Sequence, residues 1–282
     1  PDGDLLALYQ GGGMVKLDRQ SNLIWASDLP FYNHLYVATD GTILSIAKTA
    51  RVTSSLRPGE PVLEDSIVTL SSDGELLSRL SLLECFANSK FADMIHPLPD
   101  HPDIFHTNTV LPIGNESNES TAIWQTGDLL VSLREVDTVA LIDPNERTVR
   151  SAWRGPWQAQ HQPVPLPTGR ILLFDNRRAE SESRVVEFDP MSNQIVWEFS
   201  GVEADRLHSP EAGSCQRLAN GNTLITDSEK GRALEITSDK QPVWEFVSPH
   251  RAGTRGELVA TLFDVVRIPA SELEFLPAGH TD

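Results

Sequence analysis

The chain has 282 residues, 39% of them hydrophobic, which suits one large domain or two small ones. Its 40 acidic residues outnumber 23 basic ones, and the net charge is −17. This excess argues against nucleic-acid binding, because that binding depends on Lys and Arg neutralising phosphates. No window approaches the roughly 18 uninterrupted apolar residues of a membrane helix. We therefore expect a protein that binds neither nucleic acid nor membrane.

Short β-type runs fill the chain from its first residues onward. They are rich in Val, Ile, Leu and aromatic residues and are separated by turn residues, which is the pattern of strands. Only residues 81–95 favour a helix. An x-Gly pair recurs between runs, as at Gly41, Gly169 and Gly221, and predicts a tight turn between antiparallel strands. The sequence therefore predicts an all-β fold.

A second repeated element is a strand, a polar turn and a strand that carries tryptophan. Trp153, Trp197 and Trp244 occupy this position and lie 44 and 47 residues apart. A repeat of about 40–50 residues with four short strands is typical of a β-propeller blade. We expect these tryptophans to pack in the core between blades, rather than to stack on a ligand.

Five runs are candidates for the first strand of a blade, beginning near His34, His106, His161, Gly213 and Phe263. The chain opens on a turn that should follow a first strand. Residues 261–269 could supply that missing strand and close a ring of five blades. Six blades are favoured if an N-terminal segment is missing. We expect a single propeller domain over residues 1–282, with five to six four-stranded blades, lacking its first strands in the six-blade alternative.

Three of these strand starts carry histidine. First strands line the central channel of a propeller, so we expect His34, His106 and His161 to converge at one mouth. Three imidazoles there could bind Zn²⁺ or a similar metal. Alternatively, one imidazole could act as nucleophile or base while the others hold an anion.

Two further residues favour a site that holds an anion over a metal site. Asn108 follows His106 by two positions, so on a strand its side chain would point to the same side. Arg134 ends the apolar run that follows. Arginine and asparagine hold sulfate, phosphate or carboxylate well and are poor companions for a metal.

The remaining candidates have structural interpretations. Cys85 and Cys215 are too few for a disulfide framework and favour two unpaired, partly buried thiols, with a single bridge left open. Asp137 and Asp175 stand at strand ends, where aspartate commonly forms turns.

Four stretches together resemble the arylsulfate sulfotransferases, a family of bacterial propeller enzymes. They are FHTNTVL at 105–111, LLVSLR at 129–134, QAQHQ at 158–162 and LLFDN at 172–176. The resemblance extends over most of the chain. The combination of H-x-N, S-x-R, Q-H before a strand and F-D-N is more specific than the propeller turns alone.

The resemblance implies a nucleotide-independent, ping-pong transfer of a sulfuryl group from a small aryl sulfate to a phenol. It assigns the nucleophile that becomes sulfohistidine to His161, the H-x-N pair to His106 and Asn108, the strand-end arginine to Arg134, and the proton shuttle to His34. It implies no cofactor and no bound metal. It also implies a periplasmic or extracellular location, although no leader is visible, and is compatible with a homodimer.

Two other functions stay open. One is a non-catalytic propeller that binds an anionic ligand or a protein partner, and the other is a metal-dependent lyase or hydrolase that uses the three channel histidines. A shared fold is weak evidence of activity. The chain also departs from the family pattern after His161, where Gln-Pro follows and Pro163 is expected to shift the start of the strand.

Overall fold

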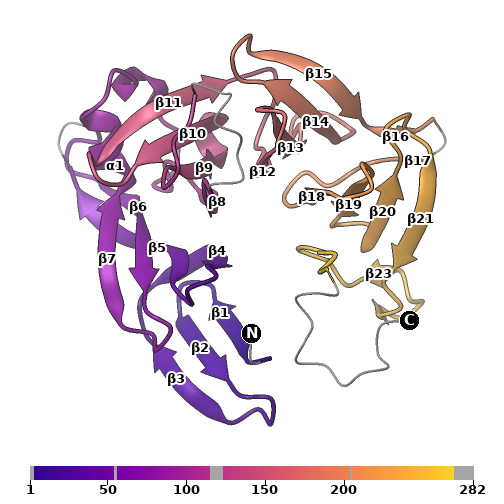
Figure 1. Cartoon of the computed structure of the whole chain (residues 1–282), viewed down its shortest axis with the longest axis horizontal. Coiled ribbons are helices and arrows are strands. Elements are labelled where there is room, and N and C mark those ends of the chain that lie inside the picture. The colour runs from indigo at the N-terminus through magenta and orange to yellow at the C-terminus, as the bar shows by residue number, and fades with distance from the viewer. Residues whose placement is uncertain (1–2, 54–55, 115–122, 204, 270–282) are drawn as a thin grey trace. The chain divides into compact units, whose positions relative to one another are not determined.

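A computed structural model describes residues 3–53, 56–114, 123–203 and 205–269 (Figure 1). The chain divides into two compact units, which we call unit 1 (residues 1–83 with 267–282) and unit 2 (residues 84–266). Within the described ranges, no helix is both long and apolar enough to cross a membrane.

Unit 1 contains two antiparallel sheets among its described residues, in the orders β1-β2-β3 and β4-β5-β6-β7. Met14 from the first sheet packs with Phe31, Ile43 and Val68 from the second in one hydrophobic core. The strands are β1 (Leu5–Tyr9), β2 (Gly13–Leu17), β3 (Leu23–Ser27), β4 (Phe31–Val37), β5 (Ile43–Val52), β6 (Pro61–Leu70) and β7 (Leu76–Ser81).

Three four-stranded antiparallel sheets make up most of unit 2 in its described part, and two short strand pairs accompany them. The first sheet contains β8 (Thr107–Pro112), β9 (Leu129–Leu133), β10 (Thr138–Asp143) and β11 (Thr148–Arg154). The second contains β12 (His161–Pro165), β13 (Ile171–Asp175), β14 (Arg184–Asp189) and β15 (Gln194–Phe199). The third contains β18 (Ser214–Arg217), β19 (Thr223–Asp227), β20 (Arg232–Ile236) and β21 (Pro242–Val247). The short pairs are β16 (Gly201–Val202) with β17 (Asp205–Arg206), and β22 (Arg251–Ala252) with β23 (Leu258–Val259).

Each of the five larger sheets is one blade, and the chain is an all-β propeller with five blades in its described residues. Four blades have four strands and the first has three. The six-blade alternative is not supported. The predicted helical segment is present as α1 (Leu82–Ala87) and a 3-10 turn, η1 (Ala92–Ile95).

Burial follows the position of a strand within its blade. Every residue of the central strands β9, β10, β13 and β19 is buried, because both faces of these strands are covered. Leu130 and Leu173 belong to one core between the first two blades of unit 2, and Phe174 and Ile225 to another between the last two. Apolar packing between blades therefore holds unit 2 together.

The turns and two of the tryptophans follow the sequence prediction. Gly41, Gly169 and Gly221 all have positive φ between the first and second strands of their blades. Trp153 donates its indole N–H to Pro190 O at 2.9 Å in the next blade, and Trp197 donates to Ser238 O at 3.2 Å.

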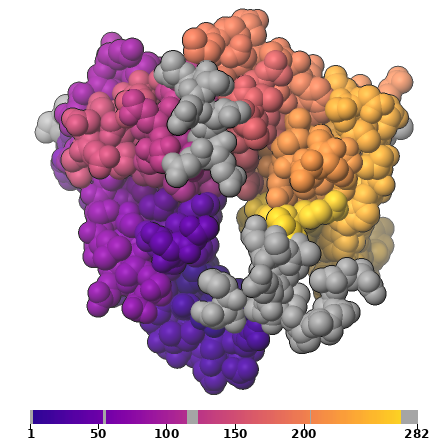
Figure 2. Space-filling model, viewed as in Figure 1, coloured from indigo at the N-terminus to yellow at the C-terminus, as the bar shows by residue number. Residues whose placement is uncertain are grey.

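The predictions for Trp244 and for residues 261–269 are wrong. Trp244 is 42% exposed, on the strand β21 whose residues are all exposed, so it is not a core residue. Residues 261–269 form no strand. Instead, Asp264 accepts a hydrogen bond from the Ser214 hydroxyl at 2.5 Å, and the Val265 N–H donates to Thr226 Oγ1 at 3.0 Å. Figure 2 shows the yellow atoms of this segment against the orange blade.

Both cysteines are unpaired and buried, as the sequence predicts. Burial raises the pKa of the Cys85 thiol to about 11, so the thiol stays protonated at neutral pH.

Gly213 is the position at which we expect the fold to be most sensitive to one methyl group. Its φ is +140°, and a Cβ there would lie 2.5 Å from the Phe174 ring. Gly213→Ala should lower the free energy of unfolding by about 1–3 kcal/mol through overpacking, beyond the backbone strain of alanine at positive φ.

Gly221→Ala is the matched control in urea unfolding. Its φ is +87°, and no atom lies within 4 Å of the place that the added methyl group would take, so it reports the backbone strain alone. Equal losses of stability in the two variants would contradict the packing argument.

Candidate functional site

His161 is the first residue of β12 and pairs with Phe174 of β13. The ladder is irregular between His161 and Val164, where Gln162 has a φ of +46°. Pro163 therefore falls inside a bulge, after the histidine, and the strand begins at His161 itself. The imidazole is half-buried at this strand start.

Two acceptors fix the protonation of the His161 ring. Nδ1 lies 2.7 Å from Asn176 Oδ1 and 3.0 Å from the Ala159 carbonyl oxygen. The Asn176 amide cannot be turned around, because its Nδ2 donates to the carbonyl oxygens of Ser209 at 2.6 Å and Ala212 at 2.7 Å. Nδ1 must therefore carry the hydrogen, and Nε2 carries the lone pair.

The surroundings also keep this ring neutral. Burial lowers the pKa of His161 to about 4, and electrostatic interactions with Arg134 and His106 act in the same direction. The hydrogen bonds to Asn176 and Ala159 raise the pKa and oppose these effects only in part. At neutral pH the side chain is therefore an uncharged, oriented imidazole, which is the form that a nitrogen nucleophile requires.

The backbone before His161 is held by carboxylates of two blades. The Ala159 N–H donates to Asp137 Oδ1 at 2.7 Å, and the Gln158 N–H donates to Asp175 Oδ1 at 2.9 Å. Burial raises the pKa of Asp137 and of Asp175. The two carboxylates thus do more than form local turns, because they fix the loop that carries the histidine.

Side chains of the preceding blade fix the same loop. Asn108 Nδ2 donates to the Gln160 carbonyl oxygen at 2.8 Å, and Asn108 Oδ1 accepts from Thr109 Oγ1 at 3.1 Å. The Gln160 side chain is fully buried and donates to Ser132 Oγ and Thr138 O. Both ends of the Asn108 amide are therefore engaged by the protein.

His106 lies just outside β8, with a φ of +46°. The expectation that it shares a strand face with Asn108 does not apply, because the alternation of a strand begins only after it. Asp103 fixes the ring instead: its Oδ2 lies 2.7 Å from His106 Nδ1, and its Oδ1 accepts the His106 backbone N–H at 3.1 Å. Strands β8 and β12 contact each other, and the Asn108 side chain reaches the Gln160 backbone, so His106 and His161 stand at neighbouring strand starts.

Arg134 follows β9 directly, at the start of the 3-10 turn η2 (Arg134–Val136). Its side chain is 4% exposed, and its Nε is buried without a hydrogen-bond partner in the described residues. Nη1 pairs with Glu135 at 2.5 Å and Nη2 pairs with Glu211. Arg134 is therefore buried, and two carboxylates already neutralise it. One of them, Glu211, lies in the loop whose carbonyl oxygens hold Asn176 beside His161.

His34 belongs to unit 1, in the irregular part of the ladder between Tyr32 and Leu35. Burial lowers its pKa to about 4. The three histidines occupy three different ladder positions, and His106 and His161 stand at the starts of two strands that contact each other, β8 and β12. The convergence of His34 with them stays a prediction.

No group of three or more His, Cys, Asp or Glu side chains in the described part of the chain is arranged to hold a metal ion.

Residues 1–249 match the family model described as Arylsulfotransferase (ASST). The chain belongs to the arylsulfotransferase family. We found no match among curated proteins. The resemblance identified from the sequence is thereby confirmed at the level of the family.

Solved structures share the fold at low sequence identity. A protein of unknown function from Bacteroides caccae is 18% identical with a TM-score of 0.58, over 86% of this chain and 77% of that one. Selenomethionine-substituted virginiamycin B lyase from Staphylococcus aureus is 11% identical with a TM-score of 0.50, over 88% and 68%. These likenesses support the propeller fold alone.

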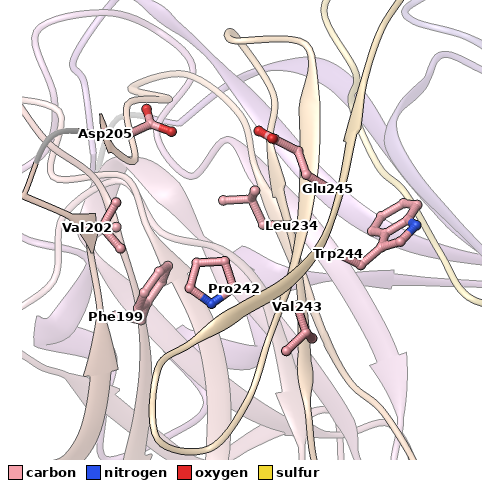
Figure 3. A pocket seen from close by; sticks show the side chains of 9 residues that line it. Phe199, Val202, Asp205, Leu234, Pro242, Val243, Trp244 and Glu245 are labelled. Carbon is pink, nitrogen blue, oxygen red and sulfur yellow. The ribbon is translucent and has the colours of Figure 1, made fainter.

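A cavity of about 410 Å³ lies elsewhere in unit 2, between the outer strands of the last two blades (Figure 3). Its apolar lining includes Phe199, Leu234 and Trp244. Asp205 and Glu245 lie along one side of it, and both pair with Arg232. It includes none of the residues around His161.

Sequence reasoning missed two residues of this site. Asn176 was present in the F-D-N stretch, yet only the fold shows that its amide faces His161. Asp103 precedes His106 by three residues, a spacing that could have signalled a side-chain contact across a turn.

The protonation of His161 can be measured directly by ¹⁵N NMR of the labelled full-length protein. We expect the Nδ1–H form with an unprotonated Nε2, and a titration midpoint near pH 4 instead of 6.5. His161→Gln assigns the signal by removing it.

Asn176→Leu removes one of the two acceptors and should raise the fraction of the Nε2–H tautomer, because the Ala159 carbonyl oxygen then favours Nδ1–H alone. A wild-type midpoint near 6.5, or a proton on Nε2, would contradict the structure.

Proposed function

We propose that the protein transfers a sulfuryl group from a small aryl sulfate to a phenol, by a ping-pong mechanism with His161 as the nucleophile. The observation that carries this proposal is the neutral imidazole of His161, with its hydrogen fixed on Nδ1 by an amide that cannot turn. Membership of the arylsulfotransferase family supports the same chemistry. Arg134 is the cation that would face the sulfuryl oxygens.

In the first half-reaction, His161 Nε2 attacks sulfur. An N–S bond forms while the bond from sulfur to the aryl oxygen breaks, and the electron pair leaves with that oxygen. His106 donates a proton from Nε2 to the departing oxygen, and the pairing of Asp103 with its Nδ1 orients the ring for this transfer. Asn176 Oδ1 stabilises the Nδ1–H of the sulfated ring, which has become positively charged.

In the second half-reaction, the acceptor phenol gives its proton to His106 Nε2 and its oxygen attacks sulfur. The N–S bond breaks and its electron pair returns to His161. Both half-reactions use the same groups in opposite directions, and no other reactant is needed. We propose that Asn108 acts by positioning the loop of His161, because its amide is engaged on both sides. The sequence assigns the proton shuttle to His34, and this stays the alternative.

The site of action and the assembly are further proposals. The family resemblance supports a periplasmic or extracellular location, and the net charge of −17 suits a well-solvated surface there. A homodimer is compatible with the resemblance.

His161→Asn should abolish sulfuryl transfer from 4-nitrophenyl sulfate to phenol, because the variant has no nitrogen lone pair to attack sulfur. Wild-type protein mixed with donor alone and quenched above neutral pH should gain the mass of one SO₃ group on the peptide that contains residue 161.

His208→Asn is the matched control, since the His208 Nδ1 also contacts a carbonyl oxygen, Ser181 O at 3.1 Å, at an exposed position. It should retain activity. Full transfer by His161→Asn, or a sulfated peptide from another part of the chain, would end the proposal.

The effect of His106→Gln on the rate of transfer should depend on the leaving group of the donor. Loss of the proton donor should slow transfer from phenyl sulfate by about 10²–10⁴-fold, and transfer from 4-nitrophenyl sulfate much less, because nitrophenolate leaves without a proton. Steady-state kinetics with both donors measures the difference. If His34→Gln slows transfer from phenyl sulfate more than transfer from 4-nitrophenyl sulfate, and His106→Gln does not, His34 is the proton shuttle.

A further inference from the structure

Four side chains around Arg134 form a closed ring of ion pairs, which we call the Arg134 ring. Arg134 pairs with Glu135 and Glu211, and Arg178 pairs with the same two carboxylates, at 3.5 Å to Glu135 and 3.3 Å to Glu211. The two positive and two negative charges cancel. An anionic donor that approaches Arg134 therefore meets a neutral cluster.

The two glutamates of the Arg134 ring are not equivalent. Glu135 is adjacent to Arg134 in sequence and its side chain is only 9% exposed, so it is a fixed partner. Glu211 comes from the loop before β18 and its side chain is 57% exposed. A carboxylate that is already exposed can exchange its partner for water at a lower cost than a buried one, so Glu211, and not Glu135, is the member that can leave.

The backbone around Glu211 cannot move with its side chain. The Glu211 N–H donates to Glu229 Oε1 at 3.0 Å. The carbonyl oxygens of Ser209 and Ala212, on either side, hold the Asn176 amide. Any exchange at Arg134 must therefore occur by rotation of the Glu211 side chain, which leaves the support of His161 in place.

We infer that Glu211 is an internal competitor for the anion position on Arg134, and that it sets the affinity for the donor. On this view, which rests on the proposed function, a sulfate ester displaces the Glu211 carboxylate from Arg134. Arg178, which is half-exposed and already 3.3 Å from Glu211, holds the displaced carboxylate. The unpartnered, buried Nε of Arg134 supplies a further donor at the same guanidinium. Donor affinity is thereby lowered by a charge that the protein itself provides.

Isothermal titration calorimetry with inorganic sulfate at low ionic strength tests this without requiring turnover. Glu211→Gln removes the competing charge and keeps the shape, so it should bind sulfate about tenfold more tightly than wild type. The KM for 4-nitrophenyl sulfate should fall by a similar factor. Arg178→Ala should act in the opposite direction and weaken sulfate binding, because the displaced carboxylate loses its second partner.

Glu198→Gln is the matched control, because the Glu198 side chain is 52% exposed and pairs at 2.7 Å with Arg184, whose side chain is 15% exposed. It should leave sulfate affinity unchanged. Unchanged affinity in Glu211→Gln, or an equal gain in Glu198→Gln, overturns the inference even if sulfuryl transfer is observed. If Glu211→Gln binds sulfate more tightly but sulfuryl transfer is not observed, the inference is supported and the proposed function is contradicted. If Glu211→Gln unfolds, Arg178→Ala decides: binding as tight as wild type overturns the inference.

Discussion

The hydrogen bond from His161 to Asn176 is the constraint on which the chemistry of unit 2 depends. The half-buried imidazole could carry its hydrogen on either nitrogen. With the hydrogen on Nδ1, Nε2 keeps a lone pair and can act as a nucleophile, whereas a hydrogen on Nε2 blocks that attack. The Asn176 amide decides this because two carbonyl oxygens, those of Ser209 and Ala212, hold its other end. Those carbonyls belong to the loop that leads into the last blade. The reactivity of one blade is therefore determined by the backbone of its neighbour.

Much of the fold could be predicted from the sequence, because its signals are local. An x-Gly turn or an apolar run needs only its own residues to be recognised, and the strand starts near His106, His161 and Gly213 were found in this way. The error at Trp244 concerns burial, which depends on what lies beside a residue in space. Trp244 has the same sequence context as Trp197, yet Trp197 is covered by the next blade and Trp244 is largely exposed.

The sequence identified several residues of the site, but it did not show which side chains they contact. His161, His106 and Arg134 were all identified from the family pattern, but Asn176 and Glu211, which contact two of them, come from other parts of the chain. Glu211 lies 77 positions from Arg134 and Asn176 lies 15 from His161. These two partners carry no local signature, because asparagine is common in loops and turns and glutamate is common on protein surfaces. A sequence pattern can therefore identify a nucleophile without showing what orients or restrains it.

The bulge after His161 has a consequence for how this family can change. A proline in the inner strand of a blade normally costs a ladder hydrogen bond, because it has no N–H to donate. Pro163 lies in the irregular stretch between His161 and Val164, where the ladder has no bond to lose. Pro163 therefore stands two residues after the nucleophile without weakening the ladder that holds the ring. Gln162 is constrained, because its N–H donates to Thr109 Oγ1 at 3.1 Å and its side-chain amide donates to Asp264 Oδ2 at 3.3 Å. Substitutions that reshape the approach to the histidine are thus tolerated at Pro163 and opposed at Gln162.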